Sequence, residues 1–82
     1  MNNYRKLYIL YKDYEKVLKW KYKNSKQLKK YCIKVYYIYN DSFQIYLYGY
    51  DNTLKWFSND INDFNKVFLI VKKMPMATLR LC

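Results

Sequence analysis

The chain contains no histidine, one glycine and one proline among its 82 residues. Without histidine it lacks the commonest general acid and base, the usual partner of a nucleophilic serine or cysteine, and the commonest metal-binding side chain. Its single glycine cannot form a glycine-rich phosphate-binding loop. We therefore expect a protein that is not an enzyme, takes no small-molecule substrate and needs no cofactor.

Side chains that could hold a metal ion are also scarce. The two cysteines, Cys32 and Cys82, lie far apart in the sequence, whereas a structural zinc site usually takes four ligands in two close pairs. Asp51, Asp60 and Asp63 are the best remaining set, as ligands of Mg²⁺. Each of these three has a simpler role, in a turn or at the N-terminus of a helix. No metal site is predicted.

Long apolar runs are missing as well. The longest are about five residues, such as Leu7–Tyr11, whereas a membrane-spanning helix needs about 20. The N-terminal residues do not have the pattern of a secretory signal peptide. We expect a soluble, cytoplasmic protein whose two cysteines are reduced.

Tyrosine and lysine are abundant. Hydrophobic residues make up 52% of the sequence and 12 residues are tyrosine, which indicates a packed core with many rings half exposed. The length fits a single domain spanning residues 1–82. Residues with A/T-rich codons predominate, which indicates an AT-rich genome, and we expect a phage or mobile-element origin.

Positive charge dominates and is unevenly distributed. The chain has 16 basic and 6 acidic residues, which gives a net charge of +10. Residues 1–39 carry +9, residues 40–65 carry −3 and residues 66–82 carry +4. This distribution predicts a domain with one face for a polyanion and another face for a different partner.

Strand-like segments lie in the middle of the chain. Ile33–Tyr39 and Phe43–Tyr50 are rich in β-branched and aromatic residues, and Asn40-Asp41-Ser42 separates them. This pattern predicts an antiparallel hairpin. We expect a short edge strand at Thr53–Phe57 and a last strand at Ala77–Leu81.

Two segments have helical periodicity. Over residues 61–73, apolar residues recur at three- and four-residue spacing after Asp60, which suits the N-terminus of a helix. A longer, basic helix is predicted over Asp13–Cys32, with Asn24-Ser25 as a candidate break. Residues 6–12 fit either a strand or the first turns of that helix.

These elements define a small α+β domain. It has a basic amphipathic N-terminal helix, a central antiparallel hairpin or meander, and a C-terminal helix. If residues 6–12 form a strand, the order becomes the ferredoxin-like βαββαβ. If they are helical, a long helix precedes a meander of two or three strands and a closing helix.

The sharpest pattern is a series of lysines in the N-terminal helix. Six of them recur every three or four residues within an arc of roughly 80° on a helical wheel. No acid lies on that arc, whereas a helix face that serves only solubility usually mixes both signs. We predict contacts to nucleic-acid phosphates at Lys12, Lys16, Lys19, Lys23, Lys26, Lys30 and Lys34.

Aromatic rings interleave with these lysines and suggest a second kind of contact. Unpaired bases stack on exposed aromatic rings, although core packing and cross-strand pairing account for most rings of a small domain. The candidates for stacking or for contact with a partner are Trp20, Tyr22, Tyr46 and Tyr48.

The function predicted first is non-enzymatic binding of DNA or RNA, or of a ribonucleoprotein, through the lysine-rich face. The alternative is a small inhibitor of a host protein complex, such as an anti-CRISPR or another anti-defence protein. Such an inhibitor would block nucleic-acid access by protein-protein contact. A third hypothesis is membrane-surface binding by the lysine-rich helix. An uncovered edge strand would also allow a homodimer.

Overall fold

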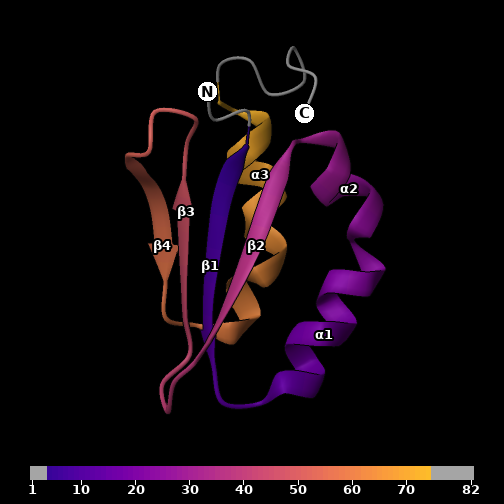
Figure 1. Ribbon diagram of the computed structural model, residues 1–82, viewed down its shortest axis with the longest axis vertical. Helices are drawn as coiled ribbons and strands as arrows, with labels where there is room; N and C mark the ends of the chain where they lie inside the picture. The colour runs from indigo at the N-terminus through magenta and orange to yellow at the C-terminus, as the bar shows by residue number, and fades with distance from the viewer. Residues whose placement is uncertain (1–3, 75–82) are drawn as a thin grey trace.

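Four strands and the helices between and after them make up residues 4–74, which are the residues that the computed structural model describes (Figure 1). The predicted α+β class is confirmed. The elements in chain order are β1 (Arg5–Tyr11), α1 (Tyr14–Lys23), α2 (Ser25–Lys30), β2 (Ile33–Tyr39), β3 (Gln44–Tyr48), β4 (Leu54–Ser58), the 3-10 helix η1 (Ile61–Asn65) and α3 (Lys66–Lys72).

The strands form a mixed sheet in the order β2-β1-β3-β4. β1 is parallel to β2 and antiparallel to β3, and β3 is antiparallel to β4. Parallel neighbours need a long crossover connection, and α1 and α2 provide it. The open question about residues 6–12 is thereby answered, because this segment is the strand β1.

The predicted hairpin is wrong in its pairing. Both of its segments are strands, but β1 lies between β2 and β3, and the antiparallel hairpin is formed by β3 and β4 instead. The physical reason lies in β1, whose inward side chains Leu7 and Ile9 are fully buried. Alternation in a strand shows which side chains share a face, but it does not show which strand is the neighbour.

The remaining expectations for the strands have mixed outcomes. β4 is the short edge strand expected near Thr53–Phe57. The beginning of the chain, β-α-β-β, is consistent with the ferredoxin-like alternative, although β1 and β2 are adjacent and parallel. The strand expected at Ala77–Leu81 lies outside the described residues.

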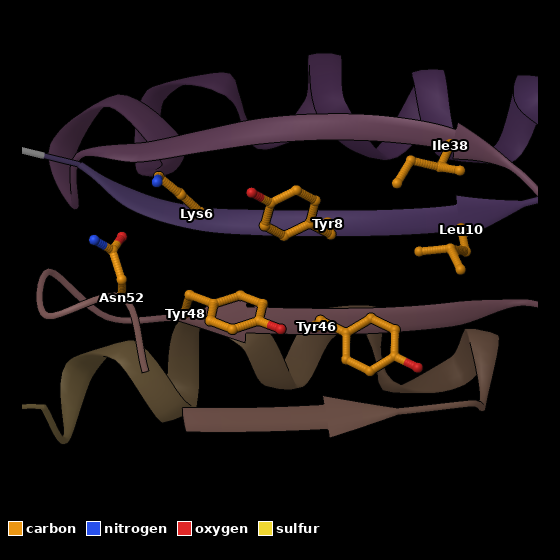
Figure 2. A pocket seen from close by; sticks show the side chains of 7 residues that line it. All are labelled: Lys6, Tyr8, Leu10, Ile38, Tyr46, Tyr48 and Asn52. Atoms are coloured by element: carbon orange, nitrogen blue, oxygen red, sulfur yellow. The ribbon is translucent and has the colours of Figure 1, made fainter. Parts of the chain in front are cut away.

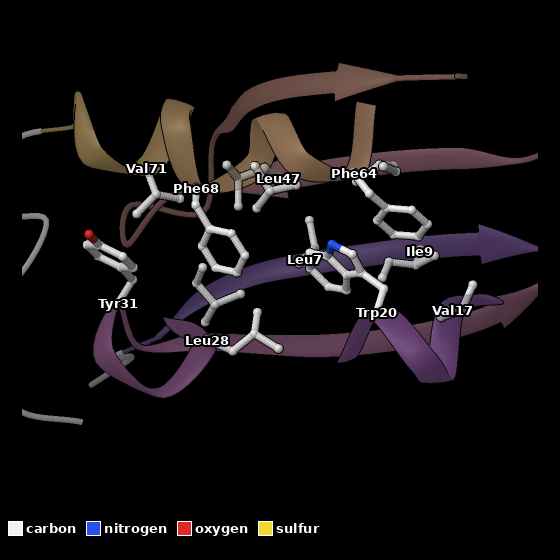
Figure 3. Packing of buried hydrophobic residues seen from close by; sticks show 13 residues of the cluster. Leu7, Ile9, Val17, Trp20, Leu28, Tyr31, Leu47, Phe64, Phe68 and Val71 are labelled. Carbon is white, nitrogen blue, oxygen red and sulfur yellow. The ribbon is translucent and has the colours of Figure 1, made fainter. Parts of the chain in front are cut away.

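The hydrophobic core lies between the sheet and the helices (Figure 3). Trp20 connects the two helical segments, because its ring stacks on Phe64 with 4.8 Å between centroids and on Phe68 with 5.8 Å. The core side chains on the sheet and the helices are Leu7, Ile9, Ile33, Ile45 and Leu47, and Val17, Trp20, Leu28, Phe64, Val67, Phe68 and Val71, with Tyr31 beside them.

Polar side chains cap the helices and interrupt the first of them. The carboxylate of Asp13 accepts a hydrogen bond from the backbone N–H of Glu15 at 3.2 Å and caps α1. The predicted break is confirmed at Asn24, whose side-chain amide donates to the carbonyl oxygen of Trp20 at 2.9 Å. Asp60 caps the C-terminal helix by accepting from the backbone N–H of Asn62 at 2.9 Å. That helix begins as the 3-10 helix η1 before it becomes α3.

Cys32 corrects the expectation of reduced thiols. It lies in the turn between α2 and β2, where its φ is 54°, it is almost fully buried, and it is disulfide-bonded. A long separation along the sequence does not by itself exclude a disulfide at Cys32. The cytoplasmic location, which rested on the absence of a signal-peptide pattern at the N-terminus, stays a prediction.

Candidate nucleic-acid interface

The helices of residues 4–74 lie against one face of the sheet. In the core, the helices pack against Leu7 and Ile9 of β1. The alternate residues of this strand, Lys6, Tyr8 and Leu10, point to the other side of the sheet (Figure 2). We call this other side the open face, because no helix of the described residues packs on it. By strand register and alternation, its side chains are Lys6, Tyr8, Leu10, Lys34, Tyr36, Ile38, Gln44, Tyr46, Tyr48, Leu54 and Phe57.

All seven lysines predicted to contact phosphates are exposed. Lys16, Lys19 and Lys23 lie on one side of α1, because residues three and four apart are neighbours on a helix surface. Lys26 and Lys30 follow on α2, beyond the interruption at Asn24. We call the surface of these five lysines the helical face.

The two remaining lysines of the series lie elsewhere. Lys12 is in the turn before α1, where it lines a hollow of about 560 Å³ together with Asp13, Asp41 and Asp60. Lys34 is on β2, beside Lys6 in the sheet register, and belongs to the open face. Lys34 thus lies on the segment that the sequence predicts as a strand, Ile33–Tyr39, and Lys12 lies just before the predicted start of the helix at Asp13.

The lysines of the helical face have no acidic partners within the described residues. The ion pairs found among residues 4–74 lie outside the helical face: they join Lys55 to Asp51 and Lys66 to Asp63, each at 3.0 Å. Lys21 lies between the helical layer and the sheet, with its ammonium 5.4 Å from the centre of the Tyr37 ring. The helical face therefore presents positive charges that no carboxylate of residues 4–74 neutralises.

Arg5 adds no exposed positive charge to the helical face or to the open face. Its side chain is only 1% exposed, and its guanidinium lies 4.4 Å from the centre of the Tyr50 ring. Nη1 donates to the carbonyl oxygen of Tyr31 at 2.8 Å and to the hydroxyl of Tyr50 at 3.0 Å. Burial lowers the pKa of this guanidinium, and the contacts with Tyr50 oppose that effect. Arg5 is a structural residue.

The four aromatic candidates are distributed over three places. Trp20 is a correction, because it is 8% exposed and stacked between core rings, where it cannot reach a ligand. Tyr22 is 70% exposed on α1, near the lysines. Tyr46 and Tyr48 lie on the open face.

The open face carries a row of four rings that crosses the whole sheet. In the strand register Tyr8 lies beside Tyr36 and opposite Tyr46, and Tyr46 lies opposite Phe57. Tyr8 and Tyr36 stack with 4.9 Å between centroids, and Tyr46 and Phe57 stack with 5.9 Å. Tyr8 and Phe57 were not among the candidates, because the row exists only in this order of strands.

A hollow lies on this face between the two stacked pairs (Figure 2). Its volume is about 340 Å³. Tyr8 and Tyr48 make a T-shaped ring contact with 5.5 Å between centroids, and the hydroxyl of Tyr46 donates to Gln44 at 2.8 Å. The residues that line it are Lys6, Tyr8, Leu10, Ile38, Tyr46, Tyr48 and Asn52.

The acids considered as metal ligands have local structural roles. Asp51 accepts hydrogen bonds from the side chain and backbone of Thr53 and pairs with Lys55, which together lower its pKa to about 2. The hydroxyl of Ser58 and the ammonium of Lys66 lower the pKa of Asp63. Within residues 4–74, no three side chains of the histidine, cysteine or acidic type meet at a point.

Comparison with protein-family models, with curated proteins and with solved structures finds no match to this chain. Among the helices of residues 4–74, none has the length and apolar character that crossing a membrane requires.

Proposed function

We propose that this protein is a non-enzymatic nucleic-acid-binding protein that contacts the phosphate backbone through the helical face. The observation that carries the proposal is the set of five exposed lysines on α1 and α2 without an acidic partner in residues 4–74. Phosphates neutralised by such lysines release condensed counterions, which favours binding at physiological salt. Lysine is a flexible point charge, so the contacts fix position on the backbone and read little sequence.

The proposal predicts a steep dependence of affinity on salt. If three to five phosphates are neutralised, log Kobs falls with log salt with a slope of about −2 to −4.5. The measurement is fluorescence anisotropy of labelled single-stranded and duplex oligonucleotides at several salt concentrations. Binding whose strength does not change with salt would contradict the proposal.

Charge reversal on α1 tests the surface directly. The double variant Lys19→Glu/Lys23→Glu should weaken binding and make the slope less steep by about 1.5 to 2. The matched control is Lys72→Glu/Lys73→Glu, which changes the net charge equally on exposed residues outside residues 12–34. Equal losses in both double variants would mean that total charge matters and that the helical face does not.

A second candidate is an inhibitor of a host protein complex. It is favoured by the exposed apolar side chains of the open face, among which Phe57 is 57% exposed, with Ile38 and Leu54 close to half exposed. Exposed apolar side chains gathered on one face often mark a protein-protein contact. A pull-down from the host, repeated after nuclease treatment, separates the candidates, because a protein inhibitor retains its partner when the nucleic acid is removed.

Membrane-surface binding has the weakest support. A helix that lies on a bilayer inserts its apolar side into the lipid, whereas the apolar side of α1, with Val17 and Trp20, is buried in the core. Insertion would therefore require the domain to open. Sedimentation with anionic vesicles tests whether the domain must open. Vesicle binding with an unchanged circular dichroism spectrum would support membrane-surface binding by the folded domain.

A further inference from the structure

The open face has a different chemistry from the helical face. The helical face offers charges on flexible side chains, whereas the open face offers rings held in place by neighbouring strands. Tyr8 and Tyr46 are directly opposite each other on β1 and β3, and each is stacked on its far side by another ring, Tyr36 or Phe57. The hollow of about 340 Å³ lies where these two pairs meet. This is close to the lower bound of about 300 Å³ for small-ligand pockets.

Planar aromatic ligands suit such a place. Bases of single-stranded nucleic acid stack on aromatic side chains without regard to sequence, because every base has a π-face. A paired base in a duplex has its faces covered by its neighbours, so it cannot use these rings without unstacking. The rings therefore favour unpaired bases.

The charges of the open face point to the same ligand. Lys6 and Lys34 are direct neighbours in the register of β1 and β2, at one end of the ring row. Like charges in adjacent positions of a sheet are destabilising, and no acid belongs to the open face to relieve them. The ammonium of Lys34 lies 5.8 Å from the centre of the Tyr36 ring, so cation and rings are close together. A phosphate beside a stacked base would relieve the repulsion.

A protein partner fits this combination less well. Protein interfaces have a core depleted of charged residues, and Lys is depleted at interfaces generally. Here two lysines lie on neighbouring strands at the β2 side of the face, in a chain with a net charge of +10. The complementary partner is an anion that also has flat apolar rings.

We propose that the open face binds unpaired bases of single-stranded nucleic acid, with Tyr8 and Tyr46 stacking on a base and Lys6 and Lys34 contacting the phosphates. The inference rests on the proposed function and adds strandedness to it. The helical face then supplies general attraction to phosphates, and the open face makes the chain prefer single strands over duplexes.

The test compares affinities for 12-nucleotide oligothymidylate, 12-nucleotide oligouridylate and a 12-base-pair duplex by fluorescence anisotropy. Wild type should bind the single strands at least about tenfold more tightly than the duplex. Tyr8→Leu or Tyr46→Leu should raise the Kd for single strands by about 5- to 150-fold, and should leave duplex binding unchanged. The two oligonucleotide types separate DNA from RNA, and preference for either agrees with the proposal.

Two control variants accompany these measurements. Tyr46→Phe keeps the ring and should retain single-strand affinity. Tyr39→Leu removes a highly exposed tyrosine of β2 that is not on the open face, and it should also bind as wild type does. Far-UV circular dichroism establishes that each variant is folded.

Photochemical crosslinking gives a readout that does not depend on variants. Oligouridylate containing 5-iodouridine should crosslink to Tyr8, Tyr46 or Tyr48, which mass spectrometry of the peptides identifies. Crosslinks confined to α1 and α2 would overturn the inference.

The outcomes separate this inference from the proposed function. Loss of binding in Lys19→Glu/Lys23→Glu with wild-type affinity in Tyr8→Leu and Tyr46→Leu overturns the open-face proposal and leaves nucleic-acid binding in place. Open-face variants that lose a captured host protein, and not an oligonucleotide, overturn it in favour of a protein partner. No binding of any oligonucleotide at low salt overturns both.

Discussion

The helical face and the open face differ in how the chain specifies them. The helical face comes from α1 and α2, and within each helix lysines that are three or four residues apart in the sequence are neighbours in space. The open face comes from four strands, and its ring row joins residues as distant as Tyr8 and Phe57. A local pattern therefore predicts the first surface, whereas the second depends on how the strands pair. The predictions below test this difference.

The largest expected effect concerns a ring that belongs to neither face. Trp20→Ala should lower the free energy of unfolding by about 3–5 kcal/mol, because it removes a buried ring stacked on Phe64 and Phe68. Tyr22→Ala, two residues later on the exposed side of α1, should change it by less than about 0.5 kcal/mol. Urea denaturation followed by circular dichroism measures both. Similar values for the two variants would mean that Trp20 is not a core residue.

Neighbouring tyrosines on β2 test the two sides of the sheet at high pH. Burial, aided by nearby Tyr14 and Tyr11, raises the pKa of Tyr37 to about 12. The neutral form is favoured in the folded state, so stability is intact below pH 10 and falls as pH rises from about 10 towards 12. Thermal melts across this range should show the fall.

Two variants of β2 test whether Tyr37 causes this fall in stability at high pH. Tyr37→Phe should flatten the stability profile between pH 10 and 12, while Tyr36→Phe on the open face should leave it unchanged, because Tyr37 is still present. An equal effect of both substitutions would show that the two sides of β2 do not differ in this respect.

A smaller effect is expected from the lysine pair of the open face. Lys6→Gln removes a positive charge from the position beside Lys34 in the sheet register and should stabilise the fold by about 0.2–1 kcal/mol. The same substitution should weaken oligonucleotide binding, so stability and affinity change in opposite directions. Lys19→Gln on the helical face should weaken binding without a gain in stability. Urea denaturation and anisotropy titrations report the two quantities.

The smallest effect is expected in the β3–β4 turn. The hydrogen bonds from Thr53 and the ion pair with Lys55 hold the pKa of Asp51 at about 2, below its usual value of 3.8. The carboxylate therefore contributes stability above about pH 4, and this contribution is lost as pH falls towards 2. Asp51→Asn should lower the Tm slightly at pH 6, and the difference from wild type should disappear near pH 2. A difference that persists at pH 2 would point to a cause other than ionisation.

Much of the fold could be predicted from local signals. Asp13 and Asp60 precede the two helical segments and cap them, and the break at Asn24 was visible in the sequence. The identity of residues 6–12 stayed open, because Leu7 and Tyr11 satisfy both a two-residue alternation and a helical repeat. The pairing of this segment with β2 and β3 makes it a strand.

The candidate site was less predictable for a related reason. The lysines of α1 were correctly predicted to be exposed, because a helical wheel captures that geometry. Trp20 was misplaced, because its burial depends on Phe64 and Phe68, more than forty residues away in the chain. The open face was represented among the predicted site residues only by Lys34, Tyr46 and Tyr48, since the insertion of β1 between β2 and β3 brings the other residues of this face together with them.

The central position of β1 also has a consequence for the synthesis of the chain. β1 leaves the ribosome first, but its two partners are complete only after Tyr39 and Tyr48 have been added. Until then both of its edges lack hydrogen-bond partners, and unpaired edges promote aggregation. The β3–β4 hairpin, in contrast, needs only a short loop and closes early. We expect the sheet to assemble after translation of most of the chain, with capture of β1 as the slow step.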